Sequence, residues 1–193
     1  DYAVVSDLIS KLEGTFGKEA PLSVTRGEVH DYLGMEIDFR IPGKVQIRMI
    51  DYIQSMLEEL PEDMDGIAAT PAASHLFDVN DDETKLDMAT SELFHHNVAK
   101  LLFLCKRVRP DTQTGVAFLT TRVKGPDKDD YKKLARVMKY LCGTLDMPLT
   151  LEASDLRITK WWADGSFAVH GDMKGHTGGM MSLGWGAIYG TST

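Results

Sequence analysis

The sequence LGMEIDFR, residues 33–40, alternates strictly between apolar residues and other residues. A period of two places the apolar side chains on one face of a strand, so this stretch predicts a half-buried β-strand. Pro42 and Gly43 follow and favour a tight turn, because proline fixes φ and glycine accepts positive φ. The alternation resumes in VQIR, residues 45–48. We therefore predict a β-hairpin over residues 33–48.

Helical periodicity surrounds this hairpin on both sides. Apolar residues recur at spacings of three and four residues, which places them on one face of a helix. Residues 62–90 lack this periodicity, and we predict a long connection there. Asp127 is a candidate N-cap for the last helix, and Gly143 a candidate stop. The predicted helices span residues 3–16, 49–60, 91–108, 115–123 and 128–143.

Strand patterns dominate the chain after Pro148. The last two segments are rich in glycine and predict an antiparallel pair. The change of pattern predicts an α+β chain with two domains, residues 1–150 and 151–193. The segments with strand patterns are residues 149–151, 157–162, 178–183 and 185–189.

The composition narrows the class of protein. Of 193 residues, 43% are hydrophobic and 26% are charged, as in ordinary globular domains. No apolar run reaches the roughly 18 residues of a transmembrane helix, and the first residues lack the basic region of a signal peptide. Cys105 and Cys142 form at most one disulfide, which favours a reducing compartment. We expect an intracellular protein with no membrane partner, either a piece of a longer protein or a domain with natural ends.

Charge is distributed unevenly along the chain. The net charge is −8, but residues 96–140 hold eleven Lys and Arg against four Asp, a local charge of +7. Exposed cations attract phosphate over about a Debye length, roughly 8 Å at physiological salt. The segment is therefore a candidate nucleic-acid-binding surface, and the alternative is a solvated helical face. Its basic residues are Lys100, Lys106, Arg107, Arg109, Arg122, Lys124, Lys128, Lys132, Lys133, Arg136 and Lys139.

Familiar catalytic patterns are mostly missing. The six His and two Cys lack the spacing of zinc ligands. Asp164 follows an apolar strand pattern in WWADGS, residues 161–166, where a carboxylate can bind Mg²⁺. Asp172 is a poor second ligand because it falls in a predicted loop. A single Asp cannot build a two-metal site, and the alternative for Asp164 is a strand-end side chain that bonds a turn.

Several short motifs follow one another in a recognisable order. They are DYLGMEI at 31–37, TP at 70–71, RPD at 109–111, RVMKYLCGT at 136–144, and ADGS at 163–166 with HTGG at 176–179. In this order and spacing the chain resembles a copia-type retrotransposon polyprotein. More closely, it resembles the C-terminal part of the reverse transcriptase and the start of its ribonuclease H domain. The motifs cover nearly the whole chain.

The resemblance implies a role for each region. The hairpin at 33–47 resembles the primer grip, and the helices between 49 and 143 resemble the thumb and connection, which follow the template–primer duplex. The eleven basic residues would then contact duplex phosphates. Asp164 would be the first Mg²⁺-binding carboxylate of the ribonuclease H half, with the remaining acids beyond Thr193. The polymerase carboxylates of that family lie in a Tyr-x-Asp-Asp hairpin, which this sequence lacks.

We therefore expect a fragment of an RNA-directed DNA polymerase polyprotein. Its fold would be a hairpin and helical thumb-like region followed by a truncated ribonuclease H-like sheet. Its partners would be an RNA–DNA or DNA duplex and the rest of the polyprotein, and Mg²⁺ would belong to the intact parent. Two alternatives stay open: a domesticated interaction module with no nucleic-acid role, and a free-standing Mg²⁺-dependent nuclease centred on Asp164.

Overall fold

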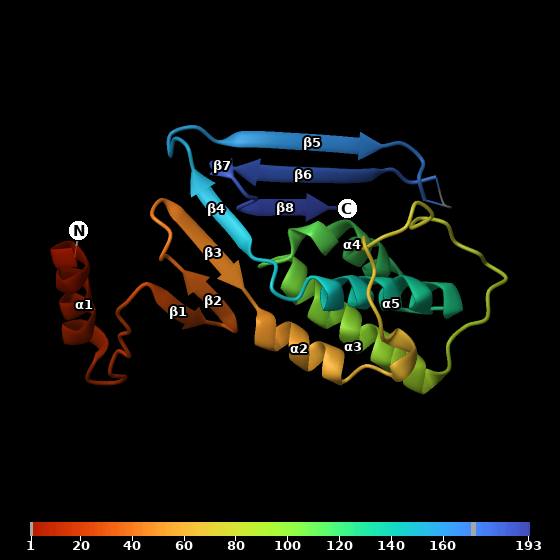
Figure 1. The fold of residues 1–193 in the computed structure, drawn as a ribbon, viewed down its shortest axis with the longest axis horizontal. Coiled ribbons are helices and arrows are strands. Elements are labelled where there is room, and N and C mark those ends of the chain that lie inside the picture. Colours follow the sequence, from red (N-terminus) through yellow and green to blue (C-terminus); the bar gives the residue numbers. More distant parts are fainter. Residues whose placement is uncertain (1, 171–172) are drawn as a thin grey trace.

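The computed structural model describes residues 2–170 and 173–193. It is a mixed helix-and-sheet structure, as the sequence predicts, with a body of packed helices beside two antiparallel sheets (Figure 1). No helix among these residues is long and apolar enough to cross a membrane. The helices of the body are α2 (Ile50–Glu58), α3 (Met88–Cys105), α4 (Gln113–Arg122) and α5 (Lys128–Gly143), with short 3₁₀ turns at Glu62–Met64 and Pro110–Thr112.

The core lies between these helices. Each contributes apolar residues at helical spacing, and α5 begins at the predicted cap, where the Asp127 side chain accepts bonds from the backbone N–H groups of Asp129 and Asp130. The bounds of three helices differ from the prediction: α2 is shorter, α3 lies three residues earlier in the chain, and α4 starts at Gln113. The apolar side chains with no exposed surface are Phe94, Leu101, Leu104, Val116, Leu119, Leu134, Met138 and Leu141.

The first sheet has the order β1-β2-β3-β4-β7. The predicted strand at 33–40 is wrong in its first residues, because Leu33 and Gly34 form a two-residue turn with φ of 52° and 76°. Positive φ at both positions is the geometry of a type I′ hairpin turn, which glycine favours. The strands are β1 (Val29–Tyr32), β2 (Met35–Asp38), β3 (Lys44–Arg48), β4 (Leu149–Ala153) and β7 (Gly184–Trp185).

The second sheet is built from β5 (Lys160–Ser166), β6 (His176–Ser182) and β8 (Tyr189–Ser192), in that order. The predicted antiparallel pair forms, with Met181 opposite Tyr189, but its second strand begins at Tyr189 and not at Trp185. Gly186 takes a φ of 80°, and the chain turns there before β8 pairs with β6. Residues 184–185 pair instead with β4 of the first sheet.

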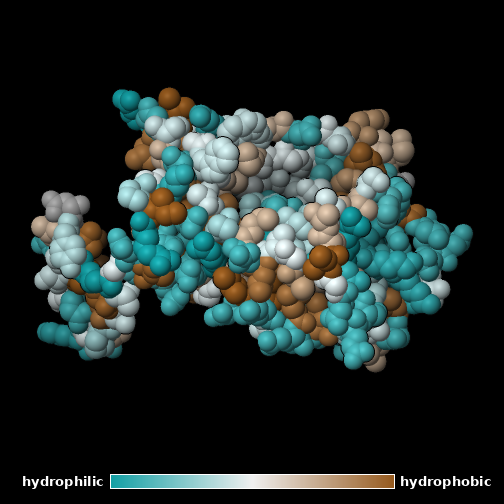
Figure 2. Space-filling model, viewed as in Figure 1, coloured by the Kyte–Doolittle hydropathy of each residue, from teal (hydrophilic) through white to brown (hydrophobic). Residues whose placement is uncertain are grey.

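Helix α1 (Tyr2–Phe16) confirms the first predicted helix, and its apolar face is exposed. None of its residues is buried, and Leu8 and Phe16 are 55% and 57% exposed. Figure 1 shows α1 standing apart from the helical body. Figure 2 shows hydrophobic residues on its surface between hydrophilic ones.

The predicted domain division at residue 150 falls inside β4. This strand pairs with β3 on one side, where Ile47 lies opposite Leu149, and with β7 on the other. One sheet therefore contains strands from both predicted domains. The division itself, and the likeness of the second sheet to ribonuclease H, stay predictions.

Candidate nucleic-acid interface

Four of the basic residues form a stripe along α5. Lys128, Lys132, Arg136 and Lys139 are separated by four, four and three residues. At 100° per residue they fall within an arc of about 80°. Lys128 and Lys132 are exposed, and Arg136 and Lys139 are partly exposed. We call these four residues the α5 stripe.

The α5 stripe borders the connection that precedes α3. The Arg136 guanidinium donates to Thr70 Oγ1 over 2.9 Å, and Lys139 Nζ donates to the Asp63 carbonyl over 3.3 Å. Lys132 and Arg136 also line a cavity of about 170 Å³ beside Pro71. These contacts hold the two half-exposed cations in place and leave the first two lysines of the stripe in solvent.

The acidic residues of α5 have their own partners. Asp130 is buried and accepts from Arg122 over 2.9 Å, while Asp129 pairs with Lys133 at 2.9 Å. Burial raises the pKa of the Asp130 carboxyl, against the opposing effect of its hydrogen bonds and of the guanidinium. Each of these two carboxylates is therefore paired with a cation outside the α5 stripe.

Two of the eleven basic residues predicted to contact phosphate are buried, and the structure corrects the prediction for these two. Arg109 is 1% exposed and donates to both Asp111 carboxylate oxygens and to Thr144. Lys133 is 8% exposed, and its ammonium donates to the Asp78 carbonyl. Both side chains join distant parts of the chain.

The remaining basic residues lie outside the α5 stripe. Lys100 pairs with Glu59, and Arg107 packs over the Phe103 ring at 3.5 Å. Lys106 donates to the Gly190 carbonyl of β8. Arg122 is tied to the α5 cap, and Lys124 is exposed just beyond α4. The structure thus brings together four of the eleven predicted residues in one row.

Asp164 lies within β5 and is exposed. Its Oδ1 accepts from the backbone N–H of Gly165 over 2.9 Å, and Gly178 lies opposite it on β6. Among residues 2–170 and 173–193, no three His, Cys, Asp or Glu side chains come close enough to hold a metal ion. Asp172 lies outside the described residues. One exposed carboxylate does not fit a two-metal site, so we derive no metal-dependent step from this chain.

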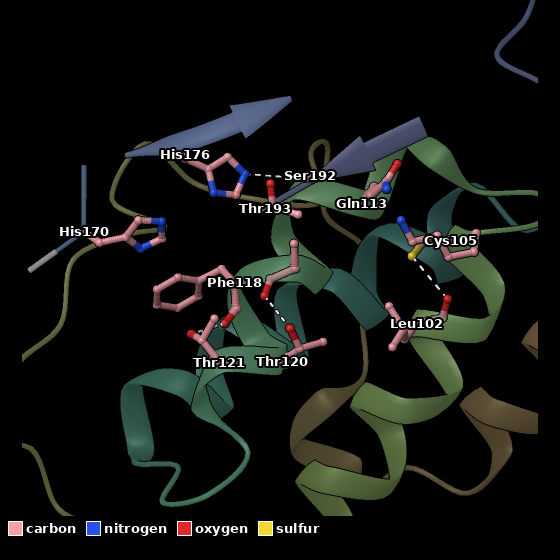
Figure 3. A pocket seen from close by; sticks show the side chains of 12 residues that line it. Leu102, Cys105, Gln113, Phe118, Thr120, Thr121, His170, His176, Ser192 and Thr193 are labelled. Atoms are coloured by element: carbon pink, nitrogen blue, oxygen red, sulfur yellow. Dashed lines mark hydrogen bonds between the residues drawn. The ribbon is translucent and has the colours of Figure 1, made fainter. Parts of the chain in front are cut away.

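The second sheet meets α4 through an aromatic and histidine cluster that the sequence did not indicate. Figure 3 shows His170, His176 and Phe118 around a cavity of about 270 Å³. The His176 ring bonds Ser192 Oγ over 2.7 Å and lies 5.6 Å from the His170 ring. Burial, and then the neighbouring His170, lower the pKa of His176. The predominantly apolar neighbours indicate a packing contact between β6, β8 and α4.

The chain is related to proteins of retrotransposons at low identity. It is 27% identical over 160 residues to the putative transposon Ty5-1 protein of Saccharomyces cerevisiae, covering 81% of the chain and 50% of that protein. It is 28% identical over 190 residues to the retrovirus-related Pol polyprotein from transposon TNT 1-94 of Nicotiana tabacum, covering 94% of the chain and 14% of the polyprotein. The chain thus spans half of one relative and a small part of the other. No family model and no solved structure matches it.

Proposed function

We propose that this chain is the part of a retrotransposon reverse transcriptase that follows the polymerase active site and leads into ribonuclease H. The observation that carries the proposal is the similarity of 94% of the chain to a Pol polyprotein. The motifs at 31–37, 136–144 and 163–166 support the same reading, because they occur in the order expected for that region. In this proposal the chain works inside the cell with the rest of the polyprotein, which supplies Mg²⁺ and the remaining carboxylates.

The activity we assign to the chain itself is binding of a template–primer duplex. The α5 stripe supports it, because four cations in one row over about three helical turns can contact successive phosphates. Such contacts displace counterions and carry little sequence preference. Neither Lys128 nor Lys132 has an ion-pair partner among the described residues, so both are available to phosphate.

The test is the binding of a fluorescent RNA–DNA hybrid by three proteins. They are the native chain, a stripe variant with Lys128→Glu, Lys132→Glu and Arg136→Glu, and a control with Lys11→Glu, Lys18→Glu and Arg26→Glu. Both variants change the net charge equally, but the control residues lie on and after α1, away from the helical body. Circular dichroism establishes that each variant folds.

We expect the stripe variant to bind about tenfold or more weakly at low salt, with a much smaller change in the control. Equal weakening in the two variants would mean that only net charge matters, and would refute the assignment to α5.

A further inference from the structure

A small cavity lies between α5 and the connection that precedes α3, and Figure 1 shows that connection crossing beside α5. Its volume is about 170 Å³. Sites for drug-sized ligands measure roughly 300–1,000 Å³, so this cavity suits one small group. The connection supplies an apolar wall that includes Pro71, Ala72 and Leu76, and α5 supplies a polar wall that includes Lys132 and Arg136.

The polar wall carries more positive than negative charge. Lys133 pairs with Asp129 over 2.9 Å, so these two charges compensate each other. Asp129 is the one carboxylate among the described residues that line the cavity, which leaves Lys132 and Arg136 without a carboxylate partner there. Two uncompensated cations beside one small cavity favour an anionic occupant.

Arg136 is held in place but keeps one unused donor. Its Nη2 donates to Thr70 Oγ1 over 2.9 Å, and the Thr70 hydroxyl donates to the Ala72 carbonyl over 2.9 Å. The Nε–H of the same guanidinium is buried and has no partner among the described residues. A buried donor without an acceptor costs free energy. An oxygen of a phosphate would supply that acceptor, because the planar guanidinium binds phosphate through its N–H groups.

Two of the short motifs of the sequence meet at this cavity. The threonine of TP, residues 70–71, orients the guanidinium, and its proline belongs to the apolar wall. Arg136 begins the motif RVMKYLCGT and lies 66 residues after Thr70. The mixed lining fits a sugar–phosphate backbone better than a free ion, because sugar carbons next to the phosphate can rest on the apolar wall.

We propose that this cavity is a seat for one phosphodiester of a nucleic-acid backbone, with the Arg136 Nε–H and the Lys132 ammonium donating to its oxygens. The inference rests on the proposed binding of a duplex and gives it a defined contact. Lys128 and Lys139 then attract the strand as point charges, whereas the seat fixes one phosphate in register on α5. Thr70 is a positioning residue, because it acts through Arg136.

A substitution that preserves charge separates the seat from general attraction. Arg136→Lys keeps the positive charge but removes the Nε–H and the planar fork. We expect it to weaken binding of the RNA–DNA hybrid about three- to tenfold, and the same exchange at the exposed Arg26 to have a much smaller effect. A native chain that binds the hybrid no better than Arg136→Lys does would refute the seat and leave duplex binding intact. A native chain that does not bind the hybrid would refute both.

Thr70 tests the positioning role. Thr70→Val keeps the shape of the side chain but removes the hydroxyl that holds the guanidinium, and we expect about threefold weaker binding. Thr70→Ser restores the hydroxyl and should bind nearly as well as the native chain. Thr70 is exposed, so neither change should alter thermal unfolding. Equal binding by the Val and Ser variants would contradict the role of the hydroxyl.

The Nε–H signal of Arg136 in ¹H–¹⁵N spectra reports on the seat directly, and its loss in Arg136→Lys assigns it. We expect the signal to shift when the hybrid is added. Inorganic phosphate at the same ionic strength should shift it only at much higher concentration. A shift with phosphate but none with the hybrid would assign the cavity to a free anion, and no shift with either would leave the Nε–H without the proposed ligand. Either result overturns the proposal.

Discussion

His176 joins the second sheet to the helical body, and one side of its ring has no partner. Nε2 bonds the Ser192 hydroxyl, while Nδ1 is buried and unpartnered among the described residues. The rings of Phe77 and His170 lie 4.9 Å and 5.6 Å away. A proton added to this ring would place a charge beside apolar rings and next to a second histidine, so the neutral form is favoured in the folded chain.

This environment predicts a loss of stability on mild acidification. Because the pKa of His176 is lowered below its ordinary value of 6.5, the folded chain binds fewer protons there than the unfolded chain. The stabilisation is present above pH 6.5 and is lost as the pH falls below it. Thermal unfolding at about pH 7.5 and about pH 5.5 measures this change, since carboxylates such as Asp38, with a pKa of about 2, titrate mostly below that window.

The control for this prediction is His176→Asn, which can still bond Ser192 but does not titrate. It should unfold at more similar temperatures at the two pH values than the native chain does. An unchanged pH dependence in the variant would show that other groups cause the effect.

Single residues of the site were only partly predictable from the sequence. The 100° rotation per residue does separate Lys132 from Lys133 on α5, so helical spacing alone could have divided the basic segment into an exposed row and an inward residue. The burial of Arg109 could not be found this way. Its partner Thr144 lies 35 residues further along the chain, and that contact exists only after α5 has packed.

At the scale of elements, the β1–β2 turn places a leucine in a backbone conformation that is unfavourable for it. Leu33 has a φ of 52°, a left-handed conformation that is costly for a residue with a β-carbon, and it is 62% exposed. Alternation of apolar residues could not reveal this turn, because the period continues through it. Gly34 was the available signal, since a type I′ turn requires positive φ at both central residues.

Leu33→Asn should therefore stabilise the chain by about 1 kcal/mol, because asparagine tolerates the left-handed region and no core contact is lost. Leu33→Val should destabilise it by a similar amount, since β-branching makes that conformation worse. Urea unfolding followed by circular dichroism measures both changes. A destabilising Asn substitution would mean that the Leu33 side chain contributes more than its exposure indicates.

Other elements also differ in whether signals in their own sequence were enough to predict them. The α5 cap and helix were predictable because Asp127 and the apolar spacing are both local signals. The exposure of the apolar face of α1 could not be predicted, because an amphipathic pattern shows which residues share a face but not what covers that face.

At the scale of the whole molecule, long-range strand pairing organises the chain. β3 and β4 are paired although about a hundred residues separate them, and the intervening chain forms most of the helical body. No local pattern specifies that partner, so the predicted boundary at 150 fell within a strand. Figure 2 shows hydrophilic residues gathered over the right-hand end of this body. The α5 stripe belongs to the helical body.

The salt dependence of RNA–DNA hybrid binding tests the central claim most directly. Each phosphate contact contributes about 0.9 to the slope of log affinity against log salt, so the four residues of the α5 stripe predict a slope of about −3 to −4. Lys132→Gln should reduce its magnitude by about one. A native chain that ignores the hybrid at low salt, or binds it with a slope near zero, would contradict a phosphate-binding role for this molecule.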